Sequence, residues 1–242
     1  IWTFNDAVTD PWDSSPAVAT VGGQTVIFAG RDDNYLYAVR DDGAAPFKLW
    51  DGPPGGTTGD VKSSPVVTTI AGTQVVIFGS EDGTLYALVA STGALYTGWG
   101  GPGTFTPGGA IFDASPAILG QTIFIGDTSN NDLYAVNLGN GVLLWDSQIT
   151  ISLPLGAIYS SPAVANVVVG GVPTDLVFFG ADDAKLYALV AASGALQWSF
   201  AVGGNIRSSP AIADIPNPPL ACTPGPTRAV IFGSEDNNLY AV

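Results

Sequence analysis

Residues 63 to 99 read Ser63-Ser64-Pro65-Val66-Val67 at their start, Val76-Ile77-Phe78-Gly79 and Leu85-Tyr86-Ala87-Leu88 in the middle, and Trp99 at their end. The apolar runs are short, rich in β-branched and aromatic residues, and separated by turn residues such as Gly83. No apolar period of 3.6 residues, which would indicate an amphipathic helix, runs through them. The pattern predicts short β-strands joined by tight turns.

The same pattern occurs five times along the chain. Its opening signature is found at Asp13-Ser14-Ser15-Pro16, Lys62-Ser63-Ser64-Pro65, Asp113-Ala114-Ser115-Pro116, Tyr159-Ser160-Ser161-Pro162 and Arg207-Ser208-Ser209-Pro210. The five prolines are 46 to 51 residues apart, and each unit has its own Leu-Tyr-Ala run. Four short strands in a repeat of this length are typical of a β-propeller blade.

The repeats predict five blades, at about residues 12–50, 61–99, 111–145, 158–198 and 206–242. The fifth unit contains three strand-like runs, and Ile1-Trp2-Thr3-Phe4 is similar to the missing fourth. We therefore expect one all-β domain over residues 1–242, a five-bladed β-propeller of four-stranded antiparallel blades whose ring is closed by the N-terminal strand completing the last blade. Donation of that strand to a neighbouring molecule, which would build a filament, is the alternative.

Composition excludes several classes of function. Seven Lys and Arg against 21 Asp and Glu give a formal net charge of −14, which disfavours nucleic acid as a partner. The chain has no His and a single Cys, Cys222, so no metal site and no catalytic residue is assigned. No apolar run is long enough to span a membrane. A chain that opens at Ile1 without Met indicates an exported mature form, extracellular or in the cell envelope.

These repeats resemble the PQQ-like, or quinoprotein-type, β-propeller family. Its repeat runs roughly Ser-Ser-Pro-Ala-Val, then Val-Phe-Gly-Ser-x-Asp-Gly-x-Leu-Tyr-Ala-Leu, then a Gly followed by Trp, and residues 79–88 come nearest to it. Quinoprotein dehydrogenases of that family have eight blades, adjacent cysteines beside the quinone and bound calcium. Since this chain has five repeats and one Cys, the resemblance implies a non-catalytic scaffold-type member without a cofactor.

The residue before each signature varies most between repeats. These residues are Asp13, Lys62, Asp113, Tyr159 and Arg207. If the following strand lines the central channel, their side chains converge on one mouth of it, as a salt-linked plug or as a small polar ligand pocket. A Trp recurs near the end of the repeats, as Trp99 does. Trp12 lies outside this set of tryptophans and is a candidate contact for a ligand or partner. The acidic turn 127–132 is expected to be an ordinary turn, with calcium binding left open.

We expect this chain to be a non-enzymatic exported scaffold that binds other proteins, or copies of itself, through its faces and edge strand. A sugar-binding lectin is the alternative, so carbohydrate stays a possible ligand, although the loops do not repeat the matched polar and aromatic residues that a lectin needs. A glycosidase is less expected, because it would need a carboxylate pair with separated pKa values, such as Asp13 and Asp113. The sequence leaves the role of Cys222 and the oligomeric state open.

Overall fold

The computed structural model describes residues 3–5, 8–43, 45–99, 103–108, 112–148, 155–215 and 227–242. Its strands form five antiparallel sheets, one for each sequence repeat, which we call blades 1 to 5. Blade 1 contains β1 (Ala17–Val21), β2 (Gln24–Arg31), β3 (Tyr35–Asp41) and β4 (Phe47–Gly52). Blade 2 contains β5 (Val66–Ile70), β6 (Thr73–Gly79), β7 (Leu85–Val89) and β8 (Thr104–Phe105). The all-β architecture and the strand order of a propeller blade are thus as predicted.

The remaining three blades repeat this order. Blade 3 contains β9 (Ala117–Leu119), β10 (Thr122–Gly126), β11 (Leu133–Asn137) and β12 (Leu143–Asp146). Blade 4 contains β13 (Ala163–Val169), β14 (Val172–Ala181), β15 (Lys185–Val190) and β16 (Leu196–Ala201). Blade 5 contains β17 (Ala211–Ile215), β18 (Thr227–Gly233) and β19 (Leu239–Ala241). Each strand pairs with the next one along the chain, so every blade is a simple meander.

The acidic turn between the second and third strands has the same local structure in every blade. One residue of each turn has a positive φ, at Asn34, Gly83, Asn131, Ala184 and Asn237, where Gly and Asn are the residue types that adopt it at least cost. In blades 1, 2, 4 and 5 an acid of the turn accepts a hydrogen bond from the Tyr hydroxyl of the following strand, as in Tyr86 to Asp82 at 2.7 Å and Tyr240 to Asp236 at 2.8 Å. In blade 3 the equivalent residue is Asn130, whose side-chain amide donates to the Tyr134 hydroxyl at 3.0 Å. The polar residue of the turn therefore holds the Tyr side chain in place in each blade.

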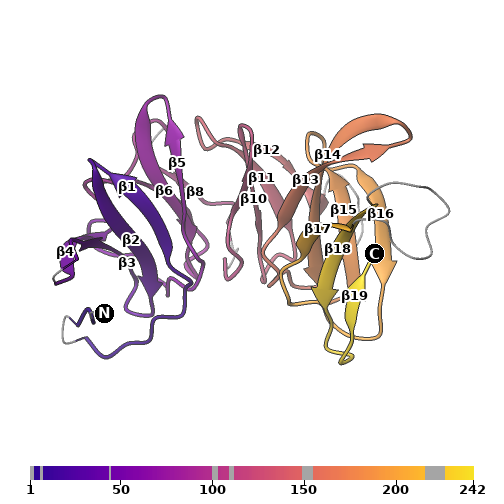
Figure 1. Cartoon of the computed structure of the whole chain (residues 1–242), viewed down its shortest axis with the longest axis horizontal. Helices are drawn as coiled ribbons and strands as arrows, with labels where there is room; N and C mark the ends of the chain where they lie inside the picture. The colour runs from indigo at the N-terminus through magenta and orange to yellow at the C-terminus, as the bar shows by residue number, and fades with distance from the viewer. Residues whose placement is uncertain are drawn as a thin grey trace.

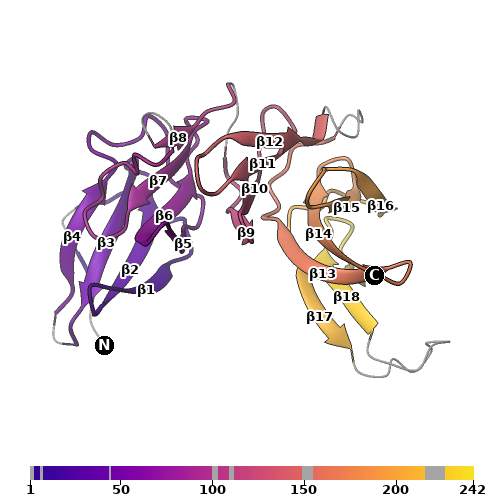
Figure 2. The ribbon, with the colours of Figure 1, turned by 90° about the horizontal axis from the view of Figure 1, so that it is seen from above.

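The blades stand side by side along an arc that runs from blade 1 to blade 5 (Figures 1 and 2). The hydrophobic core is divided into four clusters, one between each pair of neighbouring blades. The N-terminal and C-terminal ends of the described chain lie at opposite ends of the arc (Figure 1). No described residue belongs to a helix long and apolar enough to cross a membrane.

The described residues do not confirm the predicted closure of the ring by residues 1–4. Ile1 and Trp2 lie outside the described residues, while Thr3 and Phe4 belong to no strand, and the Phe4 ring is 6.3 Å from that of Trp12, beside blade 1. Blade 5 has three strands in the described part of the chain. A residue count measures chain length, whereas the angle between neighbouring blades decides whether five of them meet, and here the end blades stand apart (Figure 1).

Candidate binding surfaces at the ends of the arc

Neighbouring blades lock together through a side chain and a glycine. At each junction a buried apolar residue, which we call the knob, packs on the last glycine of the second strand of the preceding blade. The four pairs are Val61 on Gly30, Phe112 on Gly79, Ile158 on Gly126 and Ile206 on Gly180. A Cβ atom added to any of these glycines would lie only 2.1 to 2.4 Å from its knob residue, so glycine is required there.

A ladder of serines runs through the same junctions. The backbone N–H of Ser15 donates to the Oγ of Ser64, and that of Ser64 donates to the Oγ of Ser115, both at 2.9 Å. Ser115 donates in the same way to Ser161 at 2.9 Å, and Ser161 to Ser209 at 3.1 Å. The first Ser of the signature has a different role, since Ser63 Oγ accepts a hydrogen bond from Gly79 at 3.1 Å. The hydroxyls of the signature therefore satisfy backbone groups.

The Trp column also joins neighbouring blades. Trp50, Trp99 and Trp145 donate from Nε1 to the backbone oxygens of Ala90, Leu138 and Ala191 in the following blade, at 2.8 to 3.0 Å. These three rings are at most 9% exposed, so they pack between neighbouring blades. Trp198, the equivalent residue of blade 4, is only partly buried. It lines a groove of about 990 Å³ between blades 4 and 5 together with Phe178, Phe200 and Val242.

The outer surface of blade 5, here called the blade-5 end face, carries Ala211, Ile231, Gly233, Leu239 and Ala241. Leu239 is 77% exposed, whereas the equivalent leucines of the other four blades, Leu36, Leu85, Leu133 and Leu186, are all 0% exposed. Gly233 has no heavy atom within 3.7 Å of the position a Cβ would take, in contrast to the four glycines that receive knobs. The blade-5 end face is thus half of a junction.

The outer surface of blade 1, here called the blade-1 end face, carries Trp12, Val18, Ile27, Ala29, Tyr37 and Val39. Trp12 occupies the same place before the signature as the four knob residues, yet 42% of it is exposed. Its ring lies 5.1 Å from that of Tyr37. A pocket of about 280 Å³ opens beside it, next to Ala29. This face is the complementary half of a junction, with its knob exposed.

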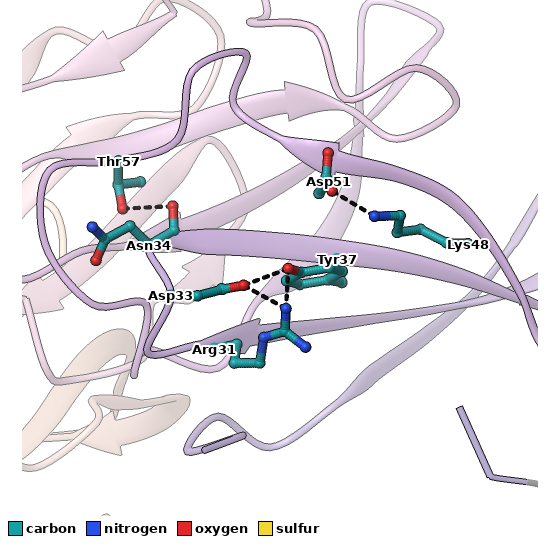
Figure 3. Close-up of polar contacts among 7 residues, drawn as sticks. All are labelled: Arg31, Asp33, Asn34, Tyr37, Lys48, Asp51 and Thr57. Carbon is teal, nitrogen blue, oxygen red and sulfur yellow. Dashed lines mark hydrogen bonds and ion pairs between the residues drawn. The ribbon is translucent and has the colours of Figure 1, made fainter. Parts of the chain in front are cut away.

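An ionic cluster supports the blade-1 end face from within. Arg31, which is 1% exposed, donates to Asp33 and to the Tyr37 hydroxyl, and Tyr37 donates to Asp33 at 2.5 Å (Figure 3). The Arg31 guanidinium also lies 4.8 Å from the Trp12 ring centroid and 4.2 Å from that of Tyr37. Cation–π contacts of this kind hold the exposed indole in a fixed orientation. The Trp12 side chain therefore has a fixed orientation in the single chain.

The predicted mouth residues fall into two separate clusters among the described residues. Lys62 pairs with Glu81 at 2.5 Å and with Asp60 at 3.9 Å, and the carboxyl groups of Asp13, Asp32 and Asp113 surround this group. In the second cluster, Arg207 pairs with Asp182 at 2.7 Å and Glu235 at 3.6 Å, and stacks 4.6 Å from the Tyr159 ring. Each base therefore pairs with acids of the turns rather than with Asp13 or Asp113.

The pKa shifts in these clusters follow from burial and like charge. Burial raises the pKa of Asp113, and a shared hydrogen bond with Glu81 raises it further, while Lys62 opposes both effects. Burial and the charge of Asp13 likewise raise the pKa of Asp32. The hydrogen bond to Glu81 raises the pKa of Lys62. The first cluster thus contains more carboxyl groups than its one lysine can neutralise.

In the acidic turn 127–132, one oxygen of each of two carboxylates accepts backbone hydrogen bonds, while the buried Oδ2 of Asp127 has no hydrogen-bond partner among the described residues. Asp127 Oδ1 accepts from the N–H groups of Ser129 and Asn130, and Asp132 Oδ1 accepts from those of Ser147 and Gln148. Burial raises the pKa of both carboxyl groups. Within the described residues, no group of three or more His, Cys, Asp or Glu is placed to hold a metal ion. Cys222 lies outside the described residues.

Sequence reasoning missed the knob residues, the glycines that receive them and the true place of Trp12. The signal was present, because an apolar residue stands two positions before the first Ser or Ala of every signature. Trp12 belongs to that column, although it lies outside the column of tryptophans that end the repeats. A large indole at a position otherwise filled by Val, Ile and Phe concealed the equivalence.

Comparison with known proteins identifies the family of the chain. Residues 1–169 match the family described as outer membrane protein assembly factor BamB. No curated protein matches the sequence significantly. The crystal structure of BamB from Moraxella catarrhalis superposes on 99% of this chain with a TM-score of 0.66 and 16% sequence identity, and the chain covers 60% of that structure.

Two further structures have the same fold. A europium-containing methanol dehydrogenase has a TM-score of 0.66 and 11% identity, covering 97% of this chain and 50% of its own. The quinohemoprotein alcohol dehydrogenase ADHIIG from Pseudomonas putida HK5 has a TM-score of 0.66 and 13% identity, covering 100% of this chain and 41% of its own. The chain thus spans 60% or less of the length of these structures.

Proposed function

Because this chain belongs to the family described as outer membrane protein assembly factor BamB, we propose that it is a protein-binding β-propeller scaffold that acts without catalysis in the cell envelope. The observation that carries the proposal is the pair of end faces. Both expose side chains whose equivalents at the four internal junctions are buried, as Leu239 and Trp12 illustrate. Apolar surface that is preformed on a rigid scaffold favours binding to another protein.

A capture experiment tests protein binding. The immobilised chain should retain proteins from an envelope extract of its source, saturably and in competition with free chain. Val18→Lys on the blade-1 end face and Leu239→Lys on the blade-5 end face should each reduce capture, because a charge there would be desolvated on binding. Val142→Lys is the matched control, since Val142 is 56% exposed and belongs to neither face. Equal capture by all variants would contradict binding through the end faces.

The absence of catalysis is proposed from the family, and the dehydrogenase relatives make it worth testing. Adding PQQ at a constant calcium concentration should change neither the absorbance nor the melting temperature of the chain. A saturable shift in either would contradict the proposal and assign the chain to the cofactor-binding branch of the fold.

Export to the cell envelope is proposed on the family description, which names an outer membrane protein assembly factor. Fractionation of source cells, followed by immunodetection, should place the protein in the periplasmic or membrane fraction. Recovery only with cytoplasmic markers would contradict export. Nothing among the described residues favours the lectin alternative.

A further inference from the structure

We propose that the turn 127–132 of blade 3 binds a calcium ion, held by the carboxylates of Asp127 and Asp132 together with neutral oxygens around them. Blade 3 packs against blade 2 on one side and blade 4 on the other, so this turn is an internal feature of the fold. The site is independent of the proposed protein binding, because it involves neither end face.

The turn of blade 3 differs from the other four turns in its length and in its end residues. In every blade this turn runs from the residue after the last Gly of the second strand to the residue before the Leu of the third, and only in blade 3 does it have a sixth residue. The end residues elsewhere are Arg31 and Tyr35, Ser80 and Thr84, Ala181 and Lys185, and Ser234 and Asn238. Blade 3 alone has an acid at both ends, and every residue from 127 to 132 carries a side-chain oxygen, the ligand atom that hard cations prefer.

The two acids at the ends of this turn are buried and lie opposite each other. The backbone N–H of Asp127 donates to the backbone oxygen of Asp132 at 2.9 Å, as in a pair of strands. Asp127 is 0% exposed and Asp132 is 4% exposed. Burial raises the pKa of Tyr134, and the charges of Asp127 and Asp132 raise it further, so both carboxylates lie near the Tyr134 hydroxyl. Like charges that face each other across neighbouring strands repel, so this pair needs compensation.

The basic side chains of the chain do not supply this compensation. All seven lie among the described residues, and each forms an ion pair with an acid outside the turn 127–132. In blades 1 and 4 the turn contains its own base, since Arg31 pairs with Asp33 and Lys185 with Asp183. Burying an ionised carboxylate without an opposite charge is costly. Blade 3 therefore requires a cation or a proton from the solution.

An unpartnered oxygen favours a cation over a proton. Asp127 Oδ1 accepts from the backbone N–H groups of Ser129 and Asn130, whereas the buried Oδ2 has no hydrogen-bond partner among the described residues. A single proton would neutralise one carboxylate and leave the other charged. A divalent cation between Asp127 and Asp132 would neutralise both and also bind the unpartnered Oδ2.

Calcium suits this turn better than magnesium. Ca²⁺ takes about six to eight oxygen ligands in a flexible arrangement, including carboxylate, amide and backbone oxygens. Mg²⁺ demands a nearly octahedral arrangement and usually keeps several waters, which the burial of both carboxylates disfavours. Neutral oxygens of the turn, such as those of Ser129 and Asn130, would complete the calcium shell, so a third acid is not required.

Titration of the chelator-treated chain with CaCl₂ tests the site. Calorimetry should show saturable binding of one ion per chain, and the melting temperature should rise by about 5–10 °C when free Ca²⁺ is about a hundred times its Kd. Asp127→Asn and Asp132→Asn should each weaken binding about tenfold or more. Asp42→Asn is the matched control, because it removes the same charge from an acid that is 45% exposed in blade 1, and it should bind Ca²⁺ as the wild type does.

A second variant guards against loss of folding and a second readout locates the ion. Asp127→Ser should fold cooperatively, because Ser80 and Ser234 occupy the equivalent position in blades 2 and 5, and it should bind Ca²⁺ as weakly as Asp127→Asn. Tb³⁺ in place of Ca²⁺ should emit on excitation of the adjacent Tyr134 ring. Added Ca²⁺ should displace this emission, and Asp127→Ser should abolish it.

Three results would overturn the calcium site. If the wild type binds no Ca²⁺ saturably, and Asp127→Asn melts higher than the wild type at pH 7, a proton compensates the pair. Equal binding by the wild type, Asp127→Asn and Asp132→Asn would place the ion elsewhere on this acidic chain. A larger rise in melting temperature with Mg²⁺ than with Ca²⁺ at equal concentration would contradict the choice of ion. Capture of proteins through the end faces is expected to be the same in all three cases, so the proposed function is tested separately.

Discussion

Leu85 and Leu239 occupy the same position in blades 2 and 5, yet Leu85 is 0% exposed and Leu239 is 77% exposed. The two blades share their sequence pattern and their strand pairing, and only Leu85 has a following blade against it. Burying a leucine side chain is worth roughly 1.5–3 kcal/mol. The internal junction therefore shows what the end face lacks, and the sequence of blade 5 is that of a blade with a neighbour.

The largest expected difference concerns the knob residues. Phe112→Ala should lower the free energy of unfolding by about 3–5 kcal/mol, because Phe112 is fully buried between blades 2 and 3. Trp12→Ala in dilute single chains should cost only about 0.5–1 kcal/mol, for the lost contact with Arg31. Urea unfolding followed by circular dichroism measures both. Equal losses would show that Trp12 anchors its own blade, and the comparison would fail.

Much of this arrangement could be predicted from the sequence. Recurrence of the Ser-Pro signature and of the Leu-Tyr-Ala run predicted the blades and their strands. These features are local, so chain order reveals them.

Features that depend on the placement of one repeat against another could not be predicted in the same way. Whether Lys62 pairs with Asp113 or with Glu81 depends on where the turn of blade 2 lies in space. In the structure Glu81 of that turn lies 2.5 Å from Lys62. Ring closure depends on the angle between neighbouring blades, which the spacing of residues along the chain does not determine. The pairing of Gly180 with Ile206 joins consecutive repeats in space, so no single repeat displays it.

A smaller contrast is expected at the glycines. Gly180→Ala should destabilise the chain by about 1–3 kcal/mol, since the added Cβ would lie 2.1 Å from Ile206 in a packed core. Gly233→Ala should change the stability of the single chain by less than about 0.5 kcal/mol, because its surroundings are open. Similar losses of stability at both positions would mean that the space above Gly233 is already filled.

The serine ladder should give a contrast near 1 kcal/mol. Ser64→Ala removes the acceptor of the Ser15 N–H at an internal junction and should cost about 0.5–1.5 kcal/mol. Ser15→Ala removes a hydroxyl that accepts from no described residue, so the melting temperature of dilute single chains should stay as it is. A drop in the melting temperature of single chains for Ser15→Ala would show that this hydroxyl already stabilises blade 1.

The smallest expected effect is a pH dependence that separates the internal Asp113 from its end-face equivalent, Asp13. Burial and then Glu81, in the preceding blade, raise the pKa of Asp113 in the folded chain above its unfolded value. The folded state therefore binds the proton more tightly, so stability should fall as pH rises from the unfolded value, about 3.9, through the raised folded one, and should stay lower above it. Asp113→Asn removes this contribution and should make the melting temperature less dependent on pH over that interval, with a value at pH 7 no lower than that of the wild type.

Asp13→Asn is the matched control for this measurement, because Asp13 stands at the equivalent position of blade 1, which has no blade before it among the described residues. Thermal melts of the wild type and both variants, taken between pH 4 and 7, measure the difference. A flatter profile for Asp13→Asn than for Asp113→Asn would show that the acid at the open end carries the titration. Coupling between neighbouring blades would then not be its cause.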